Sequence, residues 1–246
     1  MASRTVFNKN SPEGLFDANQ RYEHQTNWSA ELRRYVYEKT PGDKLRILEV
    51  GCGTGAVLRR VEQEIPERIG LLCGIDLSCQ ALKFAYGKSV ENLTAADGTA
   101  LPFADNCFDL VFCHYLLLWA AEPVSILLEM RRVLRNGGLC AALAEPCYGE
   151  MSASPDDLFE LAVLQREVLI RQGIDPEMGK KLGILFGSAG FKGAEHGRYR
   201  KAAFSPEGLE TEVHRILSDV GMKKYTMNPK VRYDYAVPTY FAIVRK

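Results

Sequence analysis

The sequence lacks an excess of charge, a long apolar run and a cysteine pair at metal-binding spacing. Lys and Arg together number 31, as do Asp and Glu. This balance gives no long-range attraction to polyanions and argues against nucleic acid as a partner. The longest apolar runs, such as residues 113–121, are too short to span a bilayer. Residues 1–10 are polar and do not resemble a secretory signal, so we expect a protein without membrane association.

The seven cysteines are scattered along the chain and form no C-x-x-C pair. Their number is odd, and several lie in apolar stretches that are typical of strands. We therefore expect reduced thiols in the core of a cytoplasmic protein rather than disulfides. No cluster of His and Cys has the spacing of zinc ligands, so no metal site is predicted.

Short apolar runs alternate with amphipathic helical patterns through the first two thirds of the chain. Because these runs are continuously apolar, they are typical of parallel strands that are buried on both faces. The pattern indicates an α/β domain with helices on both sides of one sheet. The predicted strands cover residues 45–50, 70–75, 93–96, 107–113 and 139–144.

The pattern is less regular after residue 146. Helices are predicted over 154–171, 175–189 and 205–219, with strands over 194–203 and 235–244. The chain length fits one domain. We divide it into N-terminal lid helices (1–44), a cofactor-binding core (45–145), and a part with substrate-lid helices and the last two strands (146–246). Pro238 predicts an edge position or a local irregularity in the final strand.

The most informative motif is the glycine-rich turn between the first strand and the next helix. Gly51, Gly53 and Gly55 surround Cys52 and follow Glu49. Glycines permit positive φ angles and close approach of a ligand, and the free N–H groups of a helix N-terminus bind a carboxylate. The preceding acidic residue suits a cationic amine. The ligand implied is an amino acid joined to a nucleoside, whereas a nicotinamide site expects the longer G-x-G-x-x-G spacing.

Two further acidic residues end neighbouring predicted strands. Asp76 follows the second strand, where a carboxylate accepts hydrogen bonds from both ribose hydroxyls. Asp97 ends the third strand and is placed to accept from the amine of an adenine. Leu77 and Gly98 would lie against the faces of that base. In parallel sheets the carboxyl ends of the strands meet at one edge, so we expect these groups to share one site.

In these stretches the chain resembles the class I S-adenosylmethionine-dependent methyltransferases, particularly the type 11-like branch that acts on small molecules. The resemblance implies a Rossmann-like, doubly wound, seven-stranded sheet, mostly parallel with the last strand antiparallel. It implies that Glu49 and the Gly51–Gly55 turn hold the methionine part, that Asp76 holds the ribose and that Asp97 holds the adenine. It also places Tyr22 over the methionine part. The matching stretches are ILEVGCGTG, GIDLS, DGTALPF, FDLVFCHYLLLW and EMRRVLRNGG.

Two residues are candidates for a general base. His114 follows the fourth strand, titrates near neutral pH in its ordinary state and would also contact the cofactor. Glu145 ends the fifth strand, where its carboxylate would orient an acceptor. Each has a structural alternative: His114 as a hydrogen-bonded residue that shapes its loop, and Glu145 as part of a turn with Pro146. Tyr115 and Trp119 are placed to line an acceptor pocket, although Leu116–Leu118 indicate that part of this run belongs to the core. Tyr148 lies just beyond Glu145.

The sequence leaves three alternatives beside methyl transfer from S-adenosylmethionine to a small-molecule acceptor. The chain could bind the cofactor without transferring its methyl group. It could be a nicotinamide oxidoreductase, although the glycine spacing argues against that. It could act on protein or RNA, although no basic face or appended RNA-binding segment is present. The sequence is also compatible with a homodimer, and it does not distinguish oxygen, nitrogen and carbon acceptors.

Overall fold

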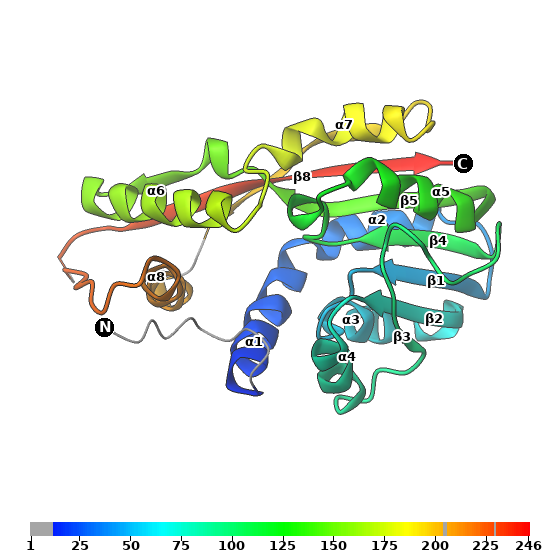
Figure 1. Ribbon diagram of the computed structural model, residues 1–246, viewed down its shortest axis with the longest axis horizontal. Coiled ribbons are helices and arrows are strands. Elements are labelled where there is room, and N and C mark those ends of the chain that lie inside the picture. The colour runs from blue at the N-terminus through cyan, green and yellow to red at the C-terminus, as the bar shows by residue number, and fades with distance from the viewer. Residues whose placement is uncertain (1–11, 204–205, 229) are drawn as a thin grey trace.

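The computed structural model describes residues 12–203, 206–228 and 230–246, and its central element is one eight-stranded sheet. The strand order is β3-β2-β1-β4-β5-β8-β6, and β7 also pairs with β8 (Figure 1). The strands are β1 (Leu45–Val50), β2 (Ile69–Asp76), β3 (Leu93–Ala95), β4 (Phe108–Cys113), β5 (Leu134–Pro146), β6 (Ser152–Ser154), β7 (Glu195–Ala203) and β8 (Asp234–Arg245).

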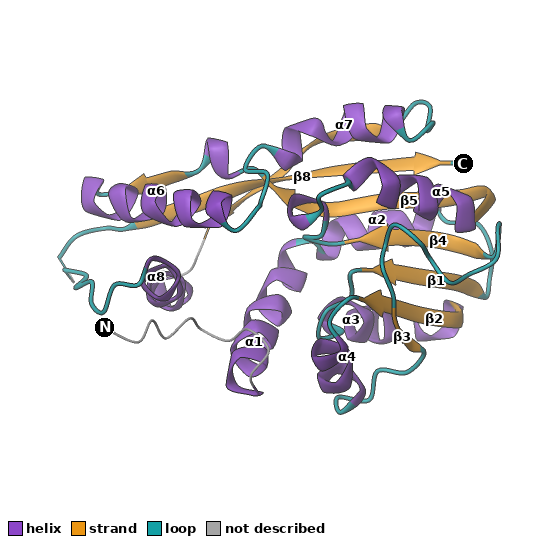
Figure 2. Ribbon diagram, in the orientation of Figure 1, coloured by secondary structure: helices purple, strands orange, loops and turns teal. Residues whose placement is uncertain are grey.

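Helices cover this sheet and extend beyond it (Figure 2). The predicted helices are confirmed to within a few residues of their ends. Residues 1–10 and Ser205, the first residue of the last predicted helix, lie outside the described residues. The helices are α1 (Pro12–Trp28), α2 (Ala30–Lys39), α3 (Ala56–Glu64), α4 (Cys79–Tyr86), α5 (Pro123–Val133), α6 (Asp156–Arg171), α7 (Met178–Ser188), α8 (Pro206–Val220) and the 3₁₀ turns η1 (Pro66–Arg68), η2 (Leu117–Trp119) and η3 (Tyr148–Glu150).

The first five strands are parallel, as their continuous apolar sequences predict. β1 pairs with β2 on one side and with β4 on the other, and β5 continues the parallel ladder beyond β4. All six residues of β4 are buried. The carboxyl ends of these strands therefore meet at one edge of the sheet, where the chain turns through the glycine-rich segment and the acidic residues.

The predicted count of seven strands is corrected to eight. The additional strand is the three-residue β6, which pairs antiparallel with the start of the twelve-residue β8. β8 is antiparallel to β5, β6 and β7, which confirms the predicted direction of the last strand. Pro238 is the point where β8 changes partner from β5 to β6, so its missing N–H leaves no gap in either of those two ladders.

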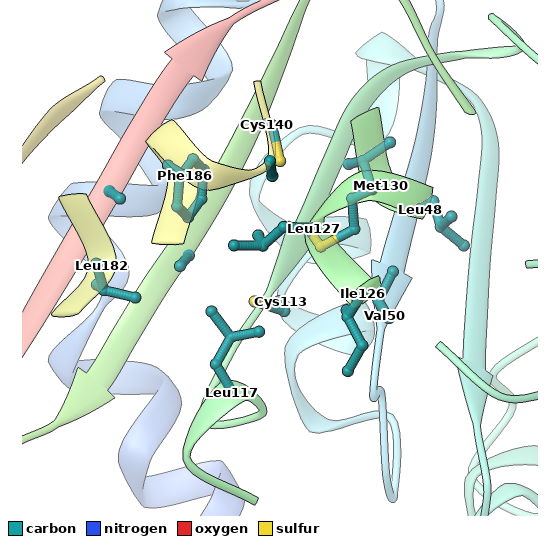
Figure 3. Packing of buried hydrophobic residues seen from close by; sticks show 14 of the residues in the cluster. Leu48, Val50, Cys113, Leu117, Ile126, Leu127, Met130, Cys140, Leu182 and Phe186 are labelled. Carbon is teal, nitrogen blue, oxygen red and sulfur yellow. The ribbon is translucent and has the colours of Figure 1, made fainter. Parts of the chain in front are cut away.

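Two hydrophobic clusters lie on opposite faces of the parallel sheet. One joins strand residues such as Val50 and Cys113 to Leu127 and Met130 of α5 and to Phe186 of α7 (Figure 3). The other joins the opposite side chains of the same strands to α2 and α3. Alternate residues of each strand face different clusters, as the period of a strand requires.

A third hydrophobic cluster forms a separate lobe around the start of β8. α6 and α8 lie beside this part of the strand, whereas α5 and α7 lie near the carboxyl-terminal part of β8 (Figure 1). The lobe core includes Leu161 of α6, Ile216 of α8 and Tyr235 of β8. Among the described residues, no helix combines the length and the apolar character that crossing a membrane requires.

Candidate functional site

The glycine-rich turn after β1 has the backbone conformation that its sequence predicts. Gly51, Gly53 and Gly55 have φ angles of +75°, +51° and +74°, in the left-handed region that favours glycine. Gly55 is the N-cap of α3. The N–H groups of Gly51 and Cys52 donate to the carbonyl oxygen of Ile75, at 2.8 and 2.9 Å. The turn is thereby tied to β2, and the buried Cys52 thiol belongs to the core rather than to the turn.

Glu49 places a buried carboxylate beneath this turn. The residue is 2% exposed, and its Oε2 atom has no hydrogen-bond partner among the described residues. Burial and the nearby carboxylate of Asp76 raise the pKa of Glu49 well above its ordinary value. The neighbouring Thr54 hydroxyl is also buried without a described partner. Buried polar atoms without partners are costly, and a ligand with a cationic amine would satisfy this one.

Asp76 joins the end of β2 to the glycine-rich turn. Its Oδ2 atom accepts the N–H of Gly53 at 2.7 Å, and its Oδ1 atom accepts the N–H of Ser78 at 2.8 Å. These bonds fix the carboxylate at the sheet edge, close to Glu49. Leu77 follows and is 72% exposed, so it is available to cover a ligand at this edge.

Asp97 and Gly98 form the third acidic position that the sequence predicts. The exposed Asp97 carboxylate accepts the N–H and the hydroxyl of Thr99, both at 2.8 Å, and these bonds lower the pKa of Asp97. Gly98 is buried, and a Cβ atom there would lie 3.3 Å from side-chain atoms of Val50 and Ile126. Glycine therefore lets the chain pass close to β1 and α5 while Asp97 faces solvent.

Helix α1 places Tyr22 at the glycine-rich turn. A Cβ atom on Gly53 would lie 3.7 Å from the Tyr22 ring. Arg59 of α3 holds α1 here: it donates to Glu23 at 2.6 Å and to Asn19 at 2.8 Å. The structure thus brings Tyr22 to the same turn as Glu49, as the sequence-based hypothesis requires.

His114 differs from the expectation of a base that titrates near neutral pH. Burial, and then the positive charge of Arg33, lower the pKa of His114 to about 3. Its Nε2 atom lies 3.2 Å from the Oγ atom of Ser29, at the junction of α1 and α2. Near neutral pH the imidazole is uncharged and a weak base. The geometry favours the alternative in which His114 shapes its loop.

Glu145 is also engaged by the protein itself. The residue is fully buried, with 0% exposure. Its Oε1 atom accepts the N–H groups of Leu116 and Leu117 at 2.9 and 3.0 Å, and its Oε2 atom accepts that of Leu118 at 3.1 Å. Both carboxylate oxygens are therefore used within the chain, and the geometry favours a role in holding the loop over direct contact with an acceptor.

Tyr115 and Tyr148 are two phenols that follow the ends of β4 and β5. Both rings pack against the cluster shared with α5 and α7. Within the described residues neither hydroxyl forms a hydrogen bond, and burial raises the pKa of both, so they stay protonated as donors. The charges of Glu212 and Arg215 act on both phenols. Trp119 is 45% exposed.

A polar network on α6 and α8 was not found by sequence reasoning. Arg215 donates to Asp219 at 2.6 Å and forms a close ion pair with Glu212. The amide of Gln165 lies 3.0 Å from the Tyr235 hydroxyl, and with its oxygen turned toward Arg215 it accepts from both terminal guanidinium nitrogens. No motif marks these helices, and the network exists only because the fold brings them together.

Comparisons with known proteins agree with this geometry. Residues 48–142 match the family model described as a methyltransferase domain. A malonyl-[acyl-carrier protein] O-methyltransferase of Erwinia pyrifoliae is 33% identical over 150 residues, which cover 57% of this chain and 55% of the relative. The enzyme of the same name from Hahella chejuensis is 36% identical over 102 residues, covering 39% and 36%. The matches thus span about half of these relatives or less.

Solved structures share the fold. The YcgJ protein of Bacillus subtilis has a TM-score of 0.58 and 14% identity, covering 91% of this chain and 99% of that one. Phosphoethanolamine N-methyltransferase 2 of Haemonchus contortus, solved with S-adenosyl-L-methionine, has a TM-score of 0.62 and 18% identity, covering 97% and 58%. Residues 48–142 thus match a methyltransferase domain, in agreement with the resemblance to the class I S-adenosylmethionine-dependent methyltransferases. The sequence-based resemblance is confirmed, and the nicotinamide alternative is set aside.

Proposed function

We propose that this chain transfers the methyl group of S-adenosylmethionine to a small-molecule acceptor by in-line displacement. The observation that carries the proposal is the buried, unpartnered Oε2 atom of Glu49 beneath a turn of three left-handed glycines. A carboxylate in this position is costly unless a cation satisfies it, and the amino group of the methionine part would do so.

The described residues fit this cofactor. Glu49 and the Gly51–Gly55 turn would hold its methionine part, with Tyr22 beside the turn. Asp76 would hold the ribose and Asp97 the adenine amine, with Leu77 and Gly98 flanking the base. When bound, S-adenosylmethionine supplies a methyl group that its sulfonium already activates. The contribution of the protein is orientation and exclusion of water, and orientation alone supplies roughly 7–11 kcal/mol in favourable cases.

The state of the nearby titratable groups constrains the acceptor. The pKa of His114 is lowered to about 3, and the carboxylate of Glu145 is fully hydrogen-bonded. His114 is therefore a weak base near neutral pH. Burial raises the pKa of Glu145, but backbone N–H groups already occupy both of its oxygens. Tyr115 and Tyr148 offer protonated hydroxyls that would donate to an oxygen of the acceptor and orient it. These features support an acceptor that is already nucleophilic near neutral pH, such as a carboxylate or an uncharged amine.

Formation of S-adenosylhomocysteine from S-adenosylmethionine tests the proposal directly. The acceptor panel should contain a malonyl thioester, because two relatives are malonyl-[acyl-carrier protein] O-methyltransferases. It should also contain small amines, phenols, a protein extract and bulk RNA. Product with a small molecule supports the proposal. Product only with protein or RNA would favour a macromolecular acceptor, and tight cofactor binding without product across the panel would favour a binding protein. Failure to bind the cofactor in calorimetry would overturn the proposal.

A further inference from the structure

We propose that Glu145 is a positioning residue that holds the segment 114–118, here called the post-β4 loop, in the shape that completes the cofactor site. The inference rests on the proposed function, because its test uses S-adenosylhomocysteine as the probe. It assigns Glu145 a role different from general base or acceptor contact.

The hydrogen bonds of Glu145 converge on one short stretch of backbone. Leu116, Leu117 and Leu118 are consecutive, and all three of their N–H groups point at the same carboxylate, at 2.9, 3.0 and 3.1 Å. β5 extends past the last residue of β4, since Cys113 pairs with Ala142 while the strand continues to Pro146. Glu145 therefore lies beyond the end of β4, where its side chain reaches the chain that leaves that strand.

The residue just before this stretch has an unfavourable backbone conformation. Tyr115 has a φ angle of +54°, in the left-handed region that residues with a Cβ atom rarely adopt. Such a conformation persists only where the surrounding structure holds it. The three hydrogen bonds from the next three N–H groups to Glu145 provide this restraint.

The post-β4 loop contacts both the glycine-rich turn and the junction of α1 and α2. A Cβ atom on Gly51 would lie 2.6 Å from Leu116, so the Leu116 side chain packs directly on the first glycine of the turn. His114 lies 3.2 Å from Ser29, beyond the end of the helix that carries Tyr22. A change in the backbone at Tyr115 would move both contacts together, which links the carboxylate of Glu145 to the shape of the cofactor site.

A pair of substitutions at position 115 isolates this role. Tyr115→Ala and Tyr115→Gly both remove the phenol, but only glycine adopts a φ angle of +54° without strain. Glu145→Gln keeps the shape of the side chain and replaces one accepting oxygen with an NH₂ group that faces the N–H of Leu118. An unmade buried hydrogen bond of this kind predicts a loss of roughly tenfold in the affinity for S-adenosylhomocysteine when residue 115 is Ala.

The same substitution should change the affinity less than about twofold when residue 115 is Gly, because glycine needs no restraint to keep the loop in place. Asp109→Asn is the matched control. Asp109 is a buried carboxylate at the other end of β4, where it accepts the N–H of Arg46 at 2.7 Å and pairs with Arg135. We expect this control to change the melting temperature but not the affinity.

Calorimetric titration of the full chain with S-adenosylhomocysteine, with thermal unfolding of each variant, decides the question. Equal loss of affinity from Glu145→Gln in the Ala and Gly backgrounds would overturn the inference while leaving the proposed function intact. Absence of binding by the wild-type chain would instead overturn the proposed function. Glu145→Asp, which withdraws the carboxylate by one methylene group, is the second variant if Glu145→Gln does not fold, and the same difference between backgrounds is expected.

Discussion

The Oγ atom of Ser29 lies 3.2 Å from the Nε2 atom of His114, and the Ser29 hydroxyl also accepts a hydrogen bond from Arg33 at 2.8 Å. Arg33 is itself buried and donates to Glu64 of α3 at 2.5 Å. This chain of contacts connects the junction of α1 and α2 to both the post-β4 loop and α3. The N-terminal helices are therefore attached to the core through polar groups as well as through packing.

His114→Gln should make the stability of the protein less dependent on pH between about 6 and 4. The pKa of His114 is lowered to about 3 in the folded chain and is near 6.5 in the unfolded chain, so the unfolded chain takes up the proton first as the pH falls. The wild type therefore loses stability over this range, by at most about 1.4 kcal/mol per pH unit for one proton. Urea unfolding of both proteins at several pH values measures the difference, and parallel curves would contradict it.

Glu49→Gln should stabilise the chain without ligand and weaken binding of S-adenosylhomocysteine. Burial and Asp76 raise the pKa of Glu49, so the charged form costs free energy and wild-type stability falls as the pH rises through that pKa. Loss of a charge-assisted bond to the ligand costs roughly 1.5–3 kcal/mol, or at least about tenfold in affinity. The melting temperature without ligand should rise, whereas the affinity measured by calorimetry should fall. A variant that binds as tightly as the wild type would argue against the assignment of Glu49.

Asp76→Ala should reduce the affinity for the cofactor, since it removes the acceptor for the ribose hydroxyls and the bond to Gly53. Each charge-assisted hydrogen bond contributes roughly 1.5–3 kcal/mol. Asp105→Ala removes an exposed partner of Arg132 and serves as the control with little expected effect. Calorimetry with S-adenosylhomocysteine measures both, and unchanged binding by Asp76→Ala would count against the ribose assignment.

Arg59→Met should loosen α1, because Arg59 provides bonds to Glu23 and Asn19 of that helix. Exposed or half-exposed ion pairs contribute about 0.2–1 kcal/mol each, so we expect faster amide exchange in α1 with little change in global stability. Hydrogen exchange read by mass spectrometry measures this. Arg60→Met is a neighbouring control with weaker contacts to α1. Equal exchange in α1 for both variants would show that Arg59 does not anchor the helix.

Sequence reasoning found the parallel half of the sheet because local features determine it. β4 is buried along its whole length and apolar except for Asp109, and the turn after β1 carries its glycines where left-handed φ angles occur. β6 could not be predicted in this way. Ser152–Ser154 has no apolar run, and it is a strand only because β8 extends far enough to offer a pairing partner.

The candidate site also contains residues that the sequence predicts and residues whose roles it does not predict. Glu49, Asp76 and Asp97 end predicted strands, so topology alone brings them to one edge. The roles of His114 and Glu145 depend on partners that are distant in sequence: a serine between two helices and three backbone N–H groups. The network of Gln165, Arg215 and Tyr235 likewise joins three elements, and no periodicity or motif encodes such a meeting.

The long final strand makes the lobe and the sheet core mechanically interdependent. Tyr235, near the start of β8, is part of the lobe cluster, while Ala242 and Val244 near its end belong to the cluster under α5 and α7. Side chains alternate along a strand, so a slip by one residue would turn all three toward the wrong faces at once. An error in strand pairing at either end of β8 would thus disturb side-chain packing at the other end. We therefore expect the two packed regions to unfold as a single cooperative unit.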